Sequence, residues 1–177
     1  MTSIAILAFL TAAVGPSADL RPLALGDQGW VQCYEPNDQE KTCRSIATYW
    51  KNSDGSWDNI AVVQLAPSRP FTLETVTKVS EENGAVCGTI RLKDVLNGKL
   101  RQAGKQIPKH NAVPILRKIA EGMASLIDKR ICTQFEPVPA GLIARSTIEG
   151  GNSAFPDQRV KWVSDSEGYR IEAGAPL

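Results

Sequence analysis

The chain has 177 residues, a formal net charge of +1 and 22% charged residues. This charge balance excludes binding to nucleic acid through overall charge, and we expect no nucleic-acid partner. The length is within the usual range for one domain and is enough for a substantial core, even without the first 18 residues.

The N-terminus has the pattern of an export signal. Residues 4–14 form an almost unbroken apolar run, Gly15-Pro16 ends any helix there, and no charged side chain precedes Asp19. The run has the length of a signal-peptide core and is too short to span a bilayer. We therefore expect residues 1–18 to be a signal peptide and residues 19–177 a single disulfide-stabilised domain, periplasmic or secreted, without a membrane span. The alternative is a buried N-terminal helix or strand.

Most of the remaining chain is typical of short strands separated by turns. Asp54-Gly55, Asn83-Gly84 and Asn97-Gly98 lie between apolar segments, and such dipeptides favour tight hairpins because they accept positive φ. We expect a hairpin at each of them, the third joining residues 95–96 to 99–100. The predicted strands cover residues 29–34, 43–50, 57–65, 71–80, 85–92, 131–136, 142–148 and 160–163.

One amphipathic helix is expected between Asn111 and Asp128, with Asn111 as its N-cap. Six apolar residues recur there at three- and four-residue spacings, and we expect them to pack as core: Leu116, Ile119, Ala120, Met123, Leu126 and Ile127. The predicted fold class is thus α+β. It is a mainly antiparallel sheet built from hairpins, with one late amphipathic helix packed on one face.

The four cysteines indicate structural disulfides. Their number is even and no Cys-x-x-Cys occurs, so neither a thioredoxin-like motif nor a zinc knuckle is indicated. Of the three pairings, we favour Cys33–Cys43, which closes a short local loop, and Cys87–Cys132, which ties a central strand to the segment after the helix. Disulfides form in an oxidising compartment, which agrees with export.

No catalytic, metal or cofactor motif occurs in the sequence. It lacks a nucleophile elbow, a phosphate-binding loop and a zinc-binding His-Glu-x-x-His pattern, so we assign no catalytic residue, cofactor or metal. His110, the single histidine, is typical of a surface residue. Carboxylate pairs at Glu81-Glu82 and at Asp165 with Glu167 leave open a small secreted hydrolase, or an inhibitor of one, because glycoside hydrolysis needs no local motif.

Trp50 and Trp57 form the candidate partner-binding site. With a two-residue turn at Asp54-Gly55, Trp50 opposes Asn59 and Trp57 opposes Asn52, so the two rings lie diagonally on one face. Paired tryptophans near a hairpin tip can stack on a sugar or anchor a protein. The alternative is that both rings cover the edge of the core.

The charges are unevenly distributed along the chain. Residues 91–130 contain ten Lys or Arg and three Asp or Glu, a net charge of +7, which leaves −6 for the remainder. We expect these charges to lie on the solvated faces of a hairpin and a helix. The alternative is a surface for an anionic partner, such as a phosphate-rich glycolipid or an acidic polymer.

Three short motifs carry a family resemblance: Gly-Trp-Val-Gln-Cys at 29–33, Gly-Ala-Val-Cys-Gly at 84–88 and Arg-Ile-Cys-Thr at 130–133. They resemble small exported proteins of alphaproteobacteria that have no assigned function. The resemblance covers most of the mature chain and implies export to the cell envelope. It gives no functional residue to carry over. We therefore expect a non-enzymatic envelope or extracellular module that binds a protein or glycan partner.

Overall fold

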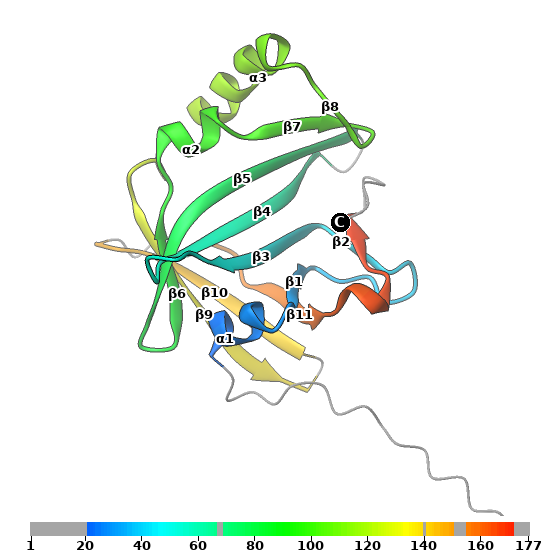
Figure 1. Ribbon diagram of the computed structural model, residues 1–177, viewed down its shortest axis with the longest axis vertical. Helices are drawn as coiled ribbons and strands as arrows, with labels where there is room; N and C mark the ends of the chain where they lie inside the picture. The colour runs from blue at the N-terminus through cyan, green and yellow to red at the C-terminus, as the bar shows by residue number, and fades with distance from the viewer. Residues whose placement is uncertain (1–20, 67–68, 140, 151–154, 172–177) are drawn as a thin grey trace, which may run out of the picture.

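Eight antiparallel strands close into a barrel (Figure 1). The computed structural model describes residues 21–66, 69–139, 141–150 and 155–171. The predicted signal peptide, residues 1–18, and the tail from Ala173 lie outside the described residues. Strands make up 51% of the structure and helices 19%, so the predicted α+β sheet with one helix packed on a face is wrong.

The barrel follows the order of the chain, and its first strand closes it. β1 (Val31–Tyr34) pairs with β3 (Ser45–Lys51) on one side and with β11 (Gln158–Val163) on the other. Closure thus pairs a strand near the start of the described chain with a strand near its end. No local sequence pattern predicts that pairing. The strands that follow β1 around the barrel are β3 (Ser45–Lys51), β4 (Trp57–Ala66), β5 (Arg69–Glu82), β6 (Ala85–Thr89), β9 (Arg130–Val138), β10 (Gly141–Ile148) and β11 (Gln158–Val163).

The three predicted hairpin turns have different outcomes. Asn83-Gly84 is confirmed: Glu82 pairs with Ala85, and both turn residues have positive φ. At Asp54-Gly55 the hairpin exists but the loop is wider, because Asp54 accepts hydrogen bonds from the backbone N–H and hydroxyl of Ser56 at 2.9 and 2.6 Å. Lys51 then pairs with Trp57, which shifts the predicted register by one residue.

The third predicted hairpin, at Asn97-Gly98, does not form. Residues Leu92–Leu96 make a short helix, α2, in which Asp94 accepts a hydrogen bond from the Arg91 N–H. Gly98 is needed here for a different reason: a Cβ on it would lie 2.7 Å from Leu73 Cδ1 and 3.0 Å from the Val95 carbonyl oxygen. The hairpin lies further along, between β7 (Lys99–Gln102) and β8 (Lys105–Gln106).

An insertion between β6 and β9 lies at one end of the barrel, uppermost in Figure 1. It consists of α2, β7, β8 and α3 (Lys109–Gly122), and β7 pairs with β5. Leu100 and Leu116 pack there with Leu73 of β5. The N-cap of α3 is Pro108 and not the predicted Asn111, so the helix starts three residues earlier than expected, and it ends at Gly122. Of its predicted core stripe, Leu116 and Ala120 are buried, whereas Ile119, Met123, Leu126 and Ile127 are only half-buried.

The opposite end of the barrel is closed by α1 (Pro22–Asp27). Leu23 of this helix packs with Tyr49 and Val86, and half-buried aromatic side chains join them, namely Trp57, Phe135 and Trp162. This apolar cluster forms the floor of the barrel. None of the helices in the described part of the chain is long and apolar enough to cross a bilayer.

Both predicted disulfides are confirmed. Cys33–Cys43 is buried in a second core cluster on the outside of the barrel, where β2 (Thr42–Cys43) pairs with β12 (Arg170–Ile171). Cys87–Cys132 joins directly opposed residues of β6 and β9. It therefore fixes the place where the insertion leaves and re-enters the barrel.

Candidate functional site

A cavity of about 360 Å³ occupies the inside of the barrel. An eight-stranded barrel has an interior that either side chains or one small ligand can fill. Here several inward positions carry side chains too short to reach the centre: Ala61 of β4, Thr75 and Thr77 of β5, and Thr133 of β9. The cavity exists because these positions leave the interior underfilled.

Most of the cavity wall is apolar. Leu73, Val79, Val86, Ile131 and Phe135 line it from the strands, and Val95, Ile119 and Met123 line it from α2, from α3 and from the residue that caps α3. Val63 and Leu65 also line it, yet they are 39% and 37% exposed. Since these two side chains point into the barrel and still reach solvent, the cavity opens beside them.

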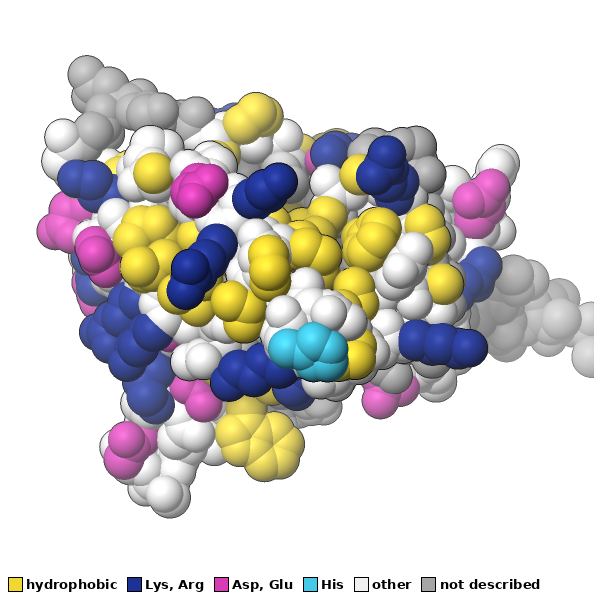
Figure 2. All heavy atoms as spheres, turned by 90° about the horizontal axis from the view of Figure 1, so that it is seen from above, with side chains coloured by type: hydrophobic (Ala, Val, Ile, Leu, Met, Phe, Trp, Pro, Cys, Tyr) yellow, Lys and Arg dark blue, Asp and Glu magenta, His cyan; other side chains and the backbone are white. Residues whose placement is uncertain are grey.

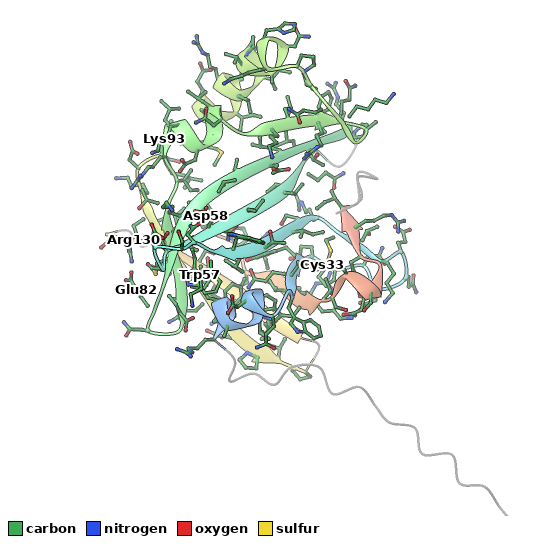
Figure 3. All side chains as sticks on the ribbon, viewed as in Figure 1. Cys33, Trp57, Asp58, Glu82, Lys93 and Arg130 are labelled. Atoms are coloured by element: carbon green, nitrogen blue, oxygen red, sulfur yellow. A yellow bond between two sulfur atoms is a disulfide. The ribbon has the colours of Figure 1, made fainter. Side chains whose placement is uncertain are left out.

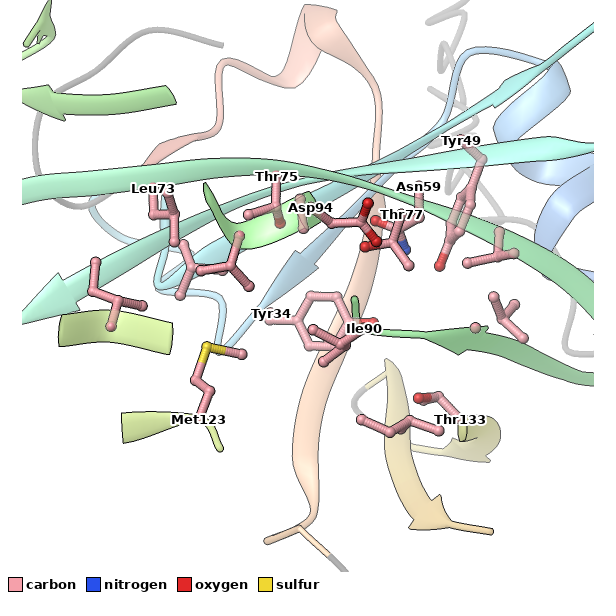
Figure 4. Close-up of a pocket in the computed structure, with 18 of the residues that line it drawn as sticks. Tyr34, Tyr49, Asn59, Leu73, Thr75, Thr77, Ile90, Asp94, Met123 and Thr133 are labelled. Carbon is pink, nitrogen blue, oxygen red and sulfur yellow. The ribbon is translucent and has the colours of Figure 1, made fainter. Parts of the chain in front are cut away.

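A cluster of neutral polar groups reaches the cavity (Figure 4). The hydroxyl groups of Tyr34 and Tyr49 donate hydrogen bonds to Oε1 of Gln32, at 3.1 and 2.8 Å. Gln32 is fully buried, and its Nε2 atom has no hydrogen-bond partner among the described residues. Burial raises the pKa of Tyr34 and of Tyr49 well above the ordinary value. Both phenols are therefore neutral at physiological pH.

Asp94 is the one charged side chain among the described residues that line the cavity. Figure 4 shows its carboxylate between the labelled threonines of β5 and Asn59 of β4 in this view. One of its oxygens accepts the Arg91 N–H at 3.3 Å, so Asp94 also caps α2. A single carboxylate cannot provide the acid and base pair that a glycosidase uses.

The carboxylate pairs noted in the sequence lie elsewhere. Glu82 is on the barrel surface, where an ion pair with Arg130 and a hydrogen bond from Ser80 hold its pKa below the ordinary value (Figure 3). Glu167 accepts the backbone N–H of Ser164 at 2.9 Å and caps a short 3-10 turn. Neither pair lines the cavity. His110 is exposed in the first turn of α3, and no group of three metal-binding side chains occurs in the described ranges.

Trp50 and Trp57 do not share a face. Trp50 opposes Asp58, and Lys51 opposes Trp57, so the one-residue change of register turns the two rings to opposite sides of the sheet. Trp57 packs into the floor cluster, whereas Trp50 is 67% exposed on the outer surface. The predicted joint site is therefore wrong in its geometry, and partner binding at Trp50 alone stays a prediction.

The two tryptophans should respond differently to truncation. Trp57→Ala removes a packed ring from the floor and is expected to lower the free energy of unfolding by about 2–4 kcal/mol. Trp50→Ala serves as its matched control, and its effect should stay within about 0.5 kcal/mol because the ring is exposed. Urea unfolding followed by circular dichroism measures both. Equal losses in the two variants would contradict this placement.

Sequence reasoning missed the cavity residues. Thr75, Thr77 and Val79 fall at every second position of a predicted strand, but that spacing does not say whether the space they face is filled. No family model, curated protein or solved structure matches the chain.

Proposed function

We propose that the protein is a non-enzymatic binding module that holds one small, largely apolar molecule inside its barrel. The observation that carries this proposal is the cavity of about 360 Å³ with an apolar wall and few polar groups. Ligand sites in proteins have this size and this composition. The wall supplies affinity through burial of apolar surface, and the polar groups supply orientation.

The polar groups limit the chemistry of the ligand. Tyr34, Tyr49, Asn59 and three threonines present neutral hydroxyl and amide groups, which suit a ligand with one or a few neutral hydrogen-bonding groups. An anionic group inside would meet the Asp94 carboxylate without a cation among the lining residues to offset it. An anionic ligand is therefore disfavoured, and the neutral hydroxyl and amide groups suit a largely apolar, uncharged molecule.

The proposal also includes the cellular compartment of the protein and a second binding partner. Two disulfides favour an oxidising environment, and we place the protein in the periplasm or the medium. Trp50 supports a second surface, for an envelope protein or a glycan. Its exposed ring lies diagonally from Ile60, and Ile60 is opposed by Val76, which is 44% exposed.

Filling the cavity tests the proposal. N-phenyl-1-naphthylamine, a neutral apolar dye, is titrated into the protein and its fluorescence is followed. We expect one molecule to bind, and Ala61→Trp to weaken binding by about tenfold or more because the new ring occupies the cavity. The melting temperature should not fall, since the space is already present.

The control adds the same ring outside the barrel. Val76→Trp lies on the outer face of β5 and should leave dye binding unchanged. Failure of the unaltered protein to bind the dye would contradict the proposal. Equal binding by the unaltered protein and Ala61→Trp would place the dye outside the cavity, with the same consequence.

A further inference from the structure

The end of the barrel that carries the insertion has an exposed apolar surface. Leu92 of α2 is 47% exposed and Ile115 of α3 is 38% exposed. Figure 2 looks down on this end and shows hydrophobic side chains gathered in its middle, with lysines and arginines and a smaller number of acidic side chains around them. We call the exposed surface of residues 91–130 the mouth face.

α3 carries two apolar stripes at four-residue spacing, and only one of them is covered. The covered stripe consists of Ala112, Leu116 and Ala120, which are buried. The other stripe consists of Ile115, Ile119 and Met123. Ile119 and Met123 line the cavity, whereas Ile115 reaches solvent. The second stripe thus connects the cavity with the mouth face.

The mouth face is also strongly basic. Residues 91–130 have a net charge of +7. Three of their ten basic side chains form ion pairs, Lys99 and Arg101 both with Glu74, and Arg130 with Glu82. The other seven form no ion pair within the part of the chain that the structure describes: Arg91, Lys93, Lys105, Lys109, Arg117, Lys118 and Lys129. Their charge is available to an anionic partner.

We propose that the mouth face docks on a membrane surface that contains anionic phospholipid. Exposed apolar side chains bordered by Lys and Arg are the combination with which proteins bind the interface of such membranes. A nucleic acid or an acidic polymer would match the charge but would leave Leu92 and Ile115 facing water. A neutral bilayer would bury these two side chains but leave seven cations without counter-charges. Anionic lipid satisfies both features.

Docking in this orientation places the second stripe of α3 between the bilayer and the cavity. The side chains nearest the lipid would then belong to a stripe that also lines the cavity through Ile119 and Met123, which would favour an apolar ligand taken from the bilayer. That advantage rests on the proposed function. The docking itself does not, because it needs only the exposed surface of the mouth face.

Vesicle flotation tests the docking at low ionic strength with residues 19–177, the expected mature chain. One set of vesicles contains phosphatidylcholine alone, and the other contains equal parts of phosphatidylcholine and phosphatidylglycerol. We expect binding to the second set only. Lys109→Glu/Arg117→Glu/Lys118→Glu should weaken this binding by at least about a hundredfold, since each basic residue near an anionic surface contributes about fivefold. Ile115→Asp should weaken it as well, and its effect should persist at high salt.

The matched control is Arg44→Glu/Lys51→Glu/Arg170→Glu, which changes the net charge equally but lies outside the mouth face and should retain binding. If both triple variants lose vesicle binding equally, binding depends on net charge and not on the mouth face, and the proposal is overturned. So would equal binding to both vesicle sets, or binding to neither. A dimer in solution that Ile115→Asp dissociates, without vesicle binding, would assign the face to a second copy instead. If the protein binds the dye but does not bind either set of vesicles, the docking is refuted and the proposed ligand binding stands.

Discussion

Replacing Cys87 and Cys132 together by alanine is expected to lower the free energy of unfolding by about 4 kcal/mol. The disulfide between them closes a loop with a sequence separation of 45 residues, which contains the whole insertion. Without the bond, the unfolded chain gains the freedom of that long loop. Urea unfolding of the oxidised protein and the double variant measures the difference.

The second disulfide provides the control. Cys33–Cys43 closes a loop with a separation of only 10 residues, and the same entropy argument gives about 3 kcal/mol for its removal. Amide hydrogen exchange separates the two variants further. Loss of Cys87–Cys132 should accelerate exchange in α2 and α3, whereas loss of Cys33–Cys43 should act at β2 and β12. A loss below about 1 kcal/mol for the longer loop would contradict the prediction.

Alkaline conditions should destabilise the protein steeply through Tyr34 and Tyr49. Burial raises the pKa of both phenols in the folded state, whereas in the unfolded chain they ionise near pH 10. Their stabilising effect is thus complete below about pH 10 and is lost as the pH rises above it, because only the unfolded state releases the protons. Each tyrosine then lowers the free energy of unfolding by up to about 1.4 kcal/mol per pH unit.

Tyr34→Phe/Tyr49→Phe isolates this effect. Lys161, whose pKa is raised by the Tyr169 hydroxyl and by Asp38, also loses stabilising charge at high pH, but it does so equally in both proteins. Urea unfolding at several pH values should show a slope above pH 10 that is shallower in the variant by up to about 2.7 kcal/mol per pH unit. Parallel slopes would show that the two phenols ionise as readily in the folded protein as in the unfolded one.

The elements formed by local interactions were predictable from the sequence. The Asn83-Gly84 turn follows from the two residues that accept positive φ, and most strands match their apolar patterns to within a few residues. Both disulfide pairings were also anticipated, from loop length and position along the chain. The turn and the strands depend on residues that are neighbours in the sequence. The disulfides could be predicted because four cysteines allow only three pairings.

Features that depend on contacts between residues far apart in the sequence, or on space that no side chain fills, were not predictable. Closure requires β1 to pair with β11, and nothing in either strand encodes that choice locally. The loop at Asp54 is set by one side chain that binds the Ser56 backbone, and this changed the face on which Trp57 lies. The cavity exists because short side chains such as those of Ala61 and Thr133 leave space inside the barrel, and that space becomes apparent only when the facing strands are known.

Closure of the barrel also determines how this sheet can aggregate. Each of the eight barrel strands is hydrogen-bonded on both sides, so the outermost strand of the large sheet within the described ranges is β8. That strand has two residues, Lys105 and Gln106, and both are exposed. A short polar edge with a lysine offers a poor template for another chain. The fold is therefore protected against edge-to-edge association at high concentration, provided that β1 remains in place.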